Sequence, residues 1–191
     1  MILPIVAYGH PMLKKKSAPV SKDCPELTGL LADMWETLEK TGGVGLAAPQ
    51  VNRSIRLFIV DANQFSSTHP EAKDFKKVFI NPNILGRFGD QTTYKEGCLS
   101  LPGIGEDIVR EDGVLIEYLD ESFEKRTGRY TGIISRIIQH EYDHLEGHTF
   151  IDRIGPLRKT LLQSKLKCIR DGKCKTEYPM IFLKSKKKTY I

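Results

Sequence analysis

The sequence predicts an α+β fold built as one domain. Its 191 residues are enough to bury a hydrophobic core without disulfide bridges. Runs rich in β-branched and aromatic residues predict short strands in the middle of the chain, at 55–60, 78–80, 108–109 and 114–119. The last two would flank a turn at Glu111-Asp112-Gly113. Apolar residues at helical spacing lie before and after this region, so strands and helices are grouped separately along the chain.

The first predicted helix covers about residues 25–40. Pro25 suits its first turn, and Gly42-Gly43 would end it. One apolar stripe runs along it, formed by Leu27, Leu30, Leu31, Met34 and Leu38. A single stripe of this kind packs against a core, so this helix is predicted to be structural.

A second helix is predicted over residues 131–146. Thr131 suits the N-cap position, and Gly147 suits the first position after the helix. Its first half carries four isoleucines at helical spacing, which are Ile133, Ile134, Ile137 and Ile138. Because these side chains would be buried, the polar residues of the second half would be carried into the interior.

The polar residues of this second helix predict a metal site with its own general base. His140 and His144 lie four residues apart, so both imidazoles can reach one ion. Glu141 stands beside them, where its carboxylate can take a proton from a water molecule activated by the metal. Such a site usually takes three protein ligands and one open position, so a third ligand must come from elsewhere.

Four residues can be weighed as the third ligand. Phe150 occupies the position of the last histidine in one class of zinc protease, which excludes that class. Glu177 lies in a basic tail, and His148 falls beyond the helix on a different face from His144. Cys98 remains, in the run Glu96-Gly97-Cys98-Leu99-Ser100-Leu101-Pro102-Gly103, whose tight turn could present a thiolate.

Residues 43–50 form a second unusual run, Gly43-Val44-Gly45-Leu46-Ala47-Ala48-Pro49-Gln50. Glycine and proline punctuate it, so we expect neither an ordinary strand nor an ordinary helix. The run lacks the spacing of a phosphate-binding loop. Gln50 is its only side chain able to donate a hydrogen bond, and it would either hold a ligand carbonyl or stabilise the turn.

Charge divides the chain at about residue 155. Residues 156–191 carry eleven lysines and arginines against two acids, a net +9, whereas residues 1–155 carry −4. A helix to about Arg170 and a short strand at 181–183 are predicted in this basic tail. The tail would either meet a polyanionic partner, such as nucleic acid, or form a solvated face.

Cysteine usage and hydropathy favour a cytoplasmic protein. The four cysteines show no paired framework, and the apolar start is too short for a signal peptide. No apolar run approaches the roughly eighteen residues that cross a membrane. We therefore expect reduced thiols and no membrane contact.

Three separated motifs, taken together, resemble those of the peptide deformylase family. They are Gly43-Val44-Gly45-Leu46-Ala47-Ala48-Pro49-Gln50, Glu96-Gly97-Cys98-Leu99-Ser100 and Gln139-His140-Glu141-Tyr142-Asp143-His144, in the family's order and with similar spacing. The resemblance extends from Ile2 to Asp152. It implies a catalytic domain over 1–155, with 156–191 belonging to the same unit. It also implies short, mostly antiparallel strands packed around a central metal-binding helix, followed by a further helix and the basic tail.

The resemblance implies one divalent metal ion, with Fe(II) as the native ion and zinc, nickel or cobalt accepted in its place. The implied ligands are Cys98, His140 and His144. Glu141 would be the general base, and Gln50 with the Leu99 N–H would hold the developing oxyanion. The reaction would remove the formyl group from N-formylmethionyl peptides.

The remaining implied residues bind substrate or support the ligands. Val44, Ile133 and Ile137 would form the wall of the methionine pocket. The backbones of Gly45 and Gly97 would pair with the extended peptide. Glu96 and Arg110 would form an ion pair that keeps Cys98 oriented.

Departures from the family pattern are few and spare the ligands and the base: Asn52, Glu111 and Ser135. Two alternatives stay open: an endopeptidase of the His-Glu-x-x-His kind, and a structural metal site in an RNA-binding module. Glu141 distinguishes them, since a closed structural site needs no base. The basic tail would direct the enzyme to the ribosome, where its substrate emerges.

Overall fold

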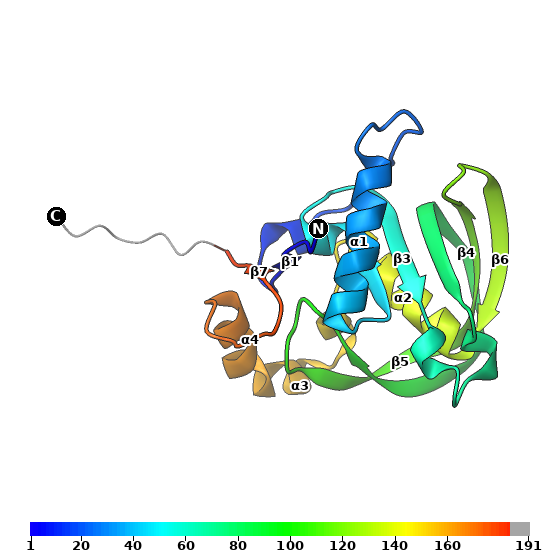
Figure 1. Cartoon of the computed structure of the whole chain (residues 1–191). Coiled ribbons are helices and arrows are strands. Elements are labelled where there is room, and N and C mark those ends of the chain that lie inside the picture. The colour runs from blue at the N-terminus through cyan, green and yellow to red at the C-terminus, as the bar shows by residue number, and fades with distance from the viewer. Residues whose placement is uncertain (184–191) are drawn as a thin grey trace.

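The computed structural model describes residues 1–183 (Figure 1). The lysine run of the predicted basic tail, within residues 184–191, lies outside this described part. The helices and strands are β1 (Ile5–Val6), α1 (Leu27–Thr41), β2 (Gly45–Ala47), β3 (Leu57–Asp61), β4 (Lys76–Gly97), β5 (Gly105–Leu119), β6 (Lys125–Thr131), α2 (Gly132–Leu145), α3 (Pro156–Leu161), α4 (Gln163–Arg170) and β7 (Met180–Ile181).

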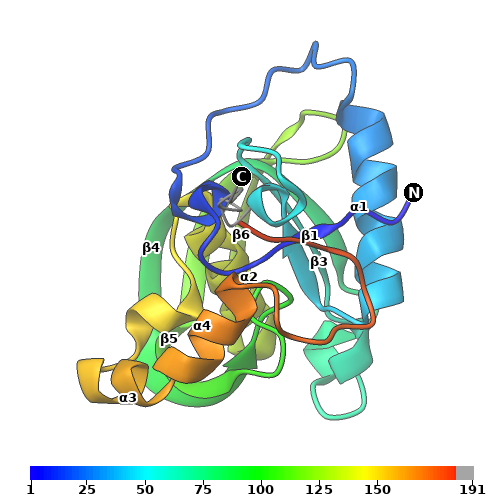
Figure 2. The same cartoon turned by 90° about the vertical axis from the view of Figure 1, so that its left-hand side faces the viewer.

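The strands form two sheets. Five strands pair in the order β2-β3-β4-β5-β6, all antiparallel, and β1 pairs with β7 in parallel. Figure 2 shows β4 and β5 curving around α2, with α1 on the outside of β3. The predicted α+β class and its mostly antiparallel strands are confirmed.

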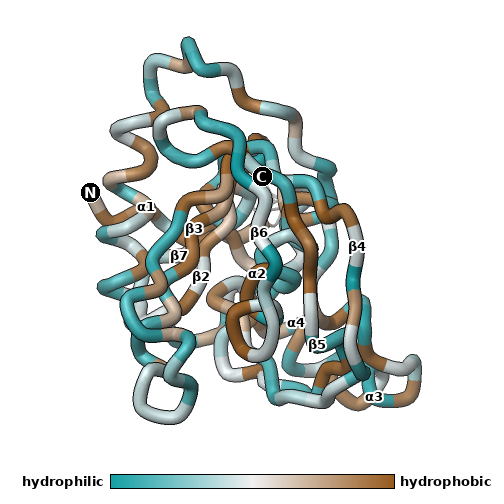
Figure 3. The backbone as a smooth tube through the Cα atoms, turned by 90° about the vertical axis from the view of Figure 1, so that its right-hand side faces the viewer, coloured by the Kyte–Doolittle hydropathy of each residue, from teal (hydrophilic) through white to brown (hydrophobic). Residues whose placement is uncertain are grey.

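Hydropathy follows the position of each strand (Figure 3). β3 is buried over four of its five residues and is apolar, whereas β6 is polar and largely exposed at the edge of the sheet. Edge strands of this kind tolerate charge on both faces, which explains why the polar segment 125–131 was not predicted as a strand.

The turn predicted at Glu111-Asp112-Gly113 is wrong, because β5 runs through it as one strand. Glu111 pairs with Gln91 and Gly113 with Phe88 on β4. A Cβ on Gly113 would lie 2.2 Å from the Phe88 ring, so glycine serves close packing here and makes no turn. Register shifts, one of them between Phe88 and Gln91, bend the long β4–β5 pair.

Residues 43–50, for which neither an ordinary strand nor an ordinary helix was expected, contain a very short strand and a 3-10 turn. Gly45–Ala47 is β2, which pairs with Phe58–Val60 of β3, and Ala48–Val51 is a short 3-10 helix. Small residues fit because β2 is an edge strand that α2 approaches closely at Gly45.

Helix α1 confirms its predicted stripe and its end. Leu27, Met34 and Leu38 are buried, and Leu30 and Leu31 pack against the same cluster. Gly42 ends the helix with a left-handed φ of 65°. This helix packs against β2 and β3 and so supports the segment that carries Gly45 and Gln50.

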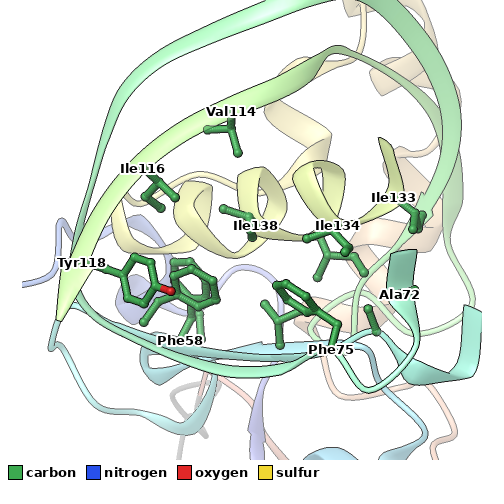
Figure 4. Packing of buried hydrophobic residues seen from close by; sticks show 14 of the residues in the cluster. Phe58, Ala72, Phe75, Val114, Ile116, Tyr118, Ile133, Ile134 and Ile138 are labelled. Carbon is green, nitrogen blue, oxygen red and sulfur yellow. The ribbon is translucent and has the colours of Figure 1, made fainter. Parts of the chain in front are cut away.

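Helix α2 lies at the centre of the molecule. All its residues are buried except Gly132 and Tyr142, and Gly147 follows its C-cap with φ 79°. Figure 4 shows Ile134 and Ile138 packing between Phe58 and Val114, on opposite walls of the curved sheet. The burial of the isoleucines fixes the helix, and therefore the histidines that follow them.

The predicted tail helix is two short helices, α3 and α4, which break at Leu162. Leu162, Leu166 and Ile169 are buried against the body, whereas Leu157 and Leu161 are exposed. The strand predicted at 181–183 is β7, which begins one residue earlier and ends at Ile181. Within the described residues, no helix is long and apolar enough to cross a membrane.

Candidate metal and catalytic site

Two elements bring three ligand side chains together. His140 and His144 lie on successive turns of α2, and Cys98 lies in the loop between β4 and β5. Their nearest ligand atoms all lie within 4.8 Å of one another, and Cys98 Sγ is 3.3 Å from His144 Nε2. Cys98 therefore lies where it could serve as the third ligand beside the helix.

The donor set fits a divalent transition metal. Burial opposes ionisation of the Cys98 thiol, but the His144 charge and hydrogen bonds with both histidines lower its pKa to about 5. The thiolate form is the one that ligates metals. His144 Nδ1 is buried without a hydrogen-bond partner among the described residues, which leaves this imidazole with unused polar capacity. One soft thiolate with two imidazoles suits Fe(II) or Zn(II) and leaves a fourth position open.

Glu141 provides a carboxylate beside the ligands. Only 4% of its surface is exposed, and its Oε2 has no hydrogen-bond partner in the described part of the chain. Burial raises the pKa of Glu141 to about 7. A carboxylate held near neutrality can both accept and release a proton.

Gly45 leaves the space that Glu141 occupies. A Cβ at this position would lie 2.5 Å from Glu141 Oε1 and 2.7 Å from its Cδ. Real Cβ atoms do not approach other atoms this closely, so any larger residue would displace the carboxylate. The glycine of β2 is therefore a steric requirement of the site.

A buried ion network supports His140. Glu96 Oε2 accepts a hydrogen bond of 2.9 Å from His140 Nδ1, and Arg110 binds both oxygens of Glu96 at 2.6 and 2.9 Å. Burial opposes ionisation, but the bonds from Arg110 and His140 hold the pKa of Glu96 well below its ordinary value. A carboxylate can only accept, so Nδ1 carries the proton and Nε2 is free to ligate. Glu96 thus contacts His140 directly, whereas its expected role in orienting Cys98 stays a prediction.

Three members of this network were missed by sequence reasoning: Arg136, Asp143 and Arg153. Arg136 donates to Glu96 Oε1 at 2.9 Å, and Asp143 accepts from Arg110 at 2.8 Å and from Arg153 at 2.6 Å. The signal was available for Arg136, which precedes His140 by four residues and so shares its helix face. Asp143 carried no signal, because its partners come from distant segments.

Gln50 presents its amide N–H₂ to the site. Its Oε1 accepts a bond of 2.8 Å from the Ala47 N–H, which fixes the amide orientation. Its Nε2 consequently points toward Cys98 Sγ and Ser100 Oγ, each at 3.4 Å. The side chain is buried, so a donor is aimed at the space beside the ligands.

A cavity of about 800 Å³ opens onto these groups. Val44, Ile133 and Ile137 contribute apolar wall, and the backbones of Gly45 and Gly97 contribute edges. All the predicted site residues line it except His144 and Arg110, which lie behind it. The cavity is also lined by four tail residues that were not among the predicted site residues: Lys175, Thr176, Glu177 and Tyr178.

Comparison with known proteins identifies the family. A family model described as polypeptide deformylase matches residues 2–160. The chain belongs to the polypeptide deformylase family. The peptide deformylase of Christiangramia forsetii is 47% identical over 194 residues, covering 98% of this chain and 99% of the relative. That of Flavobacterium psychrophilum is 45% identical, covering 98% and 100%. A peptide deformylase crystal structure from Legionella pneumophila superposes with a TM-score of 0.77 at 32% identity, covering 87% of this chain and 94% of that one.

Family membership gives the activity. Peptide deformylases are metal-dependent hydrolases, and the chain removes the formyl group from the N-terminal formylmethionine of nascent polypeptides, releasing formate. The Cys98–His140–His144 cluster could bind the metal. The comparisons do not favour an endopeptidase or an RNA-binding module with a structural metal.

Proposed function

We propose that Cys98, His140 and His144 hold one divalent ion whose open position faces the cavity. The observation that carries this is the convergence of three ligand atoms within 4.8 Å beside a buried carboxylate. When bound, a divalent ion supplies Lewis acidity, which lowers the pKa of water and polarises a carbonyl. Fe(II) is the proposed native ion, with zinc, nickel and cobalt as substitutes, because a thiolate and two imidazoles accept all four. Helix α2 is then the central metal-binding helix of the fold.

Glu141 is the proposed general base and acid. It takes a proton from the water that attacks the formyl carbon, and it then gives a proton to the departing amine. The products are formate and a peptide with a free N-terminal methionine. A carboxylate with a pKa of about 7 serves both steps, since near neutral pH it can both accept and release a proton.

Gln50 and Leu99 are the proposed oxyanion donors. The Gln50 Nε2 is already aimed into the site, because Ala47 fixes the other end of its amide. The Leu99 N–H follows the Cys98 ligand directly in the chain. Donors held in place before reaction stabilise the developing charge without a reorganisation cost.

Substrate recognition is proposed to combine one apolar pocket with backbone pairing. Val44, Ile133 and Ile137 line the cavity and would receive the methionine side chain. Gly45 and Gly97 border the same cavity, and their backbone groups would bind the peptide as an added strand. Backbone pairing is indifferent to side chains, as an enzyme that acts on many nascent chains requires.

We further propose that residues 156–191 belong to one unit with 1–155. Leu162, Leu166 and Ile169 pack into a cluster with Leu101 and Phe150. β7 pairs with β1 at the other end of the chain. The unit would work in the cytoplasm, with the basic tail directing it to the ribosome.

The activity is tested by measuring formate release from formyl-Met-Ala-Ser, using enzyme prepared anaerobically with Fe(II). We expect stoichiometric formate and free Met-Ala-Ser. The acetylated peptide is the matched control and should react far more slowly, because its added methyl group crowds the attacked carbon. Cleavage of an internal bond without formate would overturn the proposal in favour of an endopeptidase.

A further inference from the structure

The chain between α4 and β7 forms one wall of the catalytic cavity. Figure 2 shows this segment running from α4 to the lower end of α1 and returning beside β1. Its residues Lys175, Thr176, Glu177 and Tyr178 line the cavity together with Lys40 and Thr41 at the end of α1. The family model ends at residue 160, so this wall lies outside the part of the chain that the model matches.

Tyr178 connects this wall to the loop that carries the metal ligand. Its hydroxyl donates a hydrogen bond of 2.9 Å to the carbonyl oxygen of Leu99. This is the one hydrogen bond to that carbonyl found among residues 1–183. Burial raises the pKa of Tyr178 to about 12, so the phenol keeps its proton and remains a donor at neutral pH.

The backbone at Tyr178 is fixed by two hydrogen bonds. Thr176 Oγ1 donates to the Tyr178 carbonyl at 2.7 Å, and the next carbonyl, of Pro179, accepts from the Ile5 N–H at 2.8 Å. The ring packs against the hydrophobic cluster formed by α1, β2 and β3. Its hydroxyl is therefore a fixed point on the rigid body of the protein.

The Leu99 loop is held on its other side as well. The Tyr8 N–H donates to the Ser100 carbonyl at 2.9 Å, and Gln50 Nε2 lies 3.4 Å from Ser100 Oγ. These contacts fix Ser100, whereas the bond from Tyr178 fixes the peptide unit between Leu99 and Ser100. With that bond absent, the Leu99 carbonyl would have no hydrogen bond among residues 1–183, and the loop would keep the turn bond of 2.9 Å from the Leu101 N–H to the Cys98 carbonyl.

We propose that Tyr178 is a positioning residue for deformylation, acting through Leu99. Its hydroxyl holds the Leu99 carbonyl, and the Leu99 N–H on the same residue is thereby aimed at the developing oxyanion. This inference rests on the proposed role of the Leu99 N–H. We expect Tyr178 to act on the turnover step, because its hydroxyl is engaged by the Leu99 carbonyl.

The test is Tyr178→Phe, which removes the hydroxyl and keeps the ring in the cavity wall. A buried hydrogen bond of ordinary strength corresponds to about a two- to tenfold effect, so we expect kcat for formate release to fall by about that factor. The KM for formyl-Met-Ala-Ser should change less than about twofold. Amide hydrogen exchange at Leu99, measured by mass spectrometry on the metal-loaded full-length enzyme, should become faster.

Tyr130→Phe is the matched control. It removes a hydroxyl that shares a 3.1 Å hydrogen bond with Tyr118, on strands away from the cavity. The same chemical change there should leave kcat and Leu99 exchange unaltered. An equal fall in kcat for both variants would mean a general loss of rigidity and would overturn the inference.

Unchanged kcat and unchanged exchange at Leu99 in Tyr178→Phe would also overturn the inference, leaving the ring as packing alone. That failure is distinct from failure of the proposed function, because the wild-type enzyme is measured in the same assay. If the wild type releases no formate, the proposed activity fails and the exchange experiment still reports whether Tyr178 restrains Leu99.

Discussion

At the scale of single residues, the site depends on the lack of a side chain at Gly45. Gly45 lies where a Cβ would come within 2.5 Å of Glu141 Oε1. We expect Gly45→Ala to lower kcat/KM about 100-fold, because a displacement of about 1 Å in a catalytic group has an effect of this size. Steady-state formate release measures it.

Gly29→Ala is the control for that change. Gly29 lies in α1, and a Cβ there meets nothing within 4 Å. The variant should turn over like the wild type and be more stable by about 0.5–1 kcal/mol, since alanine favours helix. An active Gly45→Ala enzyme would show that Glu141 can work from a different position.

The two ends of the Gln50 amide have different roles, because the oxygen fixes its orientation and the nitrogen donates into the site. Gln50→Glu keeps the oxygen that accepts from the Ala47 N–H but removes the donor that points into the site. We expect kcat to fall about 100- to 1,000-fold, the effect of losing one oxyanion donor. The folded structure should be retained, as measured by circular dichroism. A wild-type kcat would exclude Gln50 as a donor.

At the scale of elements, Arg110 of β5 ties the sheet to the metal-binding face of α2. It lies between Glu96 of β4 and Asp143 of α2 and is 1% exposed. Arg110→Met would leave the buried Glu96 without its bidentate partner and the buried Asp143 with Arg153 as its one remaining arginine. We expect a loss of about 3–5 kcal/mol in the free energy of unfolding, measured by urea denaturation of the metal-loaded enzyme.

An exposed arginine provides the comparison for Arg110. Arg126→Met on β6 removes ion pairs with Asp120 and Glu124, at a position where the arginine side chain is 51% exposed. Its effect on unfolding should be much smaller than that of Arg110→Met. Equal effects would mean that burial of the Arg110 network contributes nothing specific.

The elements also show how far sequence reasoning reached. Helix α2 was predictable, because its isoleucines, cap residues and histidines all follow local spacing. The course of β5 was not, since the glycine at 113 reads locally as a turn and only its pairing with Phe88 reveals a strand. Arg136 was missed although it shares a helix face with His140, and Asp143 was missed because Arg110, which binds it, lies on a different element. Local patterns thus indicated the two candidate histidines, whereas the network around them depends on tertiary pairing.

At the scale of the whole molecule, the tail has a different place from the one that its charge suggested. Its helices pack on the body, its strand β7 pairs with β1, and residues 175–178 line the cavity. A variant that lacks residues 173–191 would therefore lose part of the cavity wall. Such a variant could not test ribosome binding separately from turnover.

A shorter deletion tests the ribosome hypothesis. Removing residues 184–191 takes away four lysines and leaves the described chain complete. We expect turnover of formyl-Met-Ala-Ser to be unchanged, with weaker and less salt-dependent binding to ribosomes in sedimentation assays. Unchanged binding across salt concentrations would exclude these lysines from the contact.

The identity of the metal should determine how fast the enzyme loses activity in air. If Fe(II) is native, activity should decay in air, since a thiolate–iron centre is open to oxidation, and should persist when zinc replaces iron. Activity followed over time in aerobic and anaerobic buffer measures this. Equal decay of both forms would argue against iron-specific oxidation.

The central claim is that Glu141 moves the proton beside a metal held by Cys98, His140 and His144. Measuring formate release and bound metal together in Glu141→Ala tests it most directly. We predict that turnover falls at least about 1,000-fold while one divalent ion per chain is retained. Loss of the metal along with turnover, or turnover at the wild-type rate, would contradict the account.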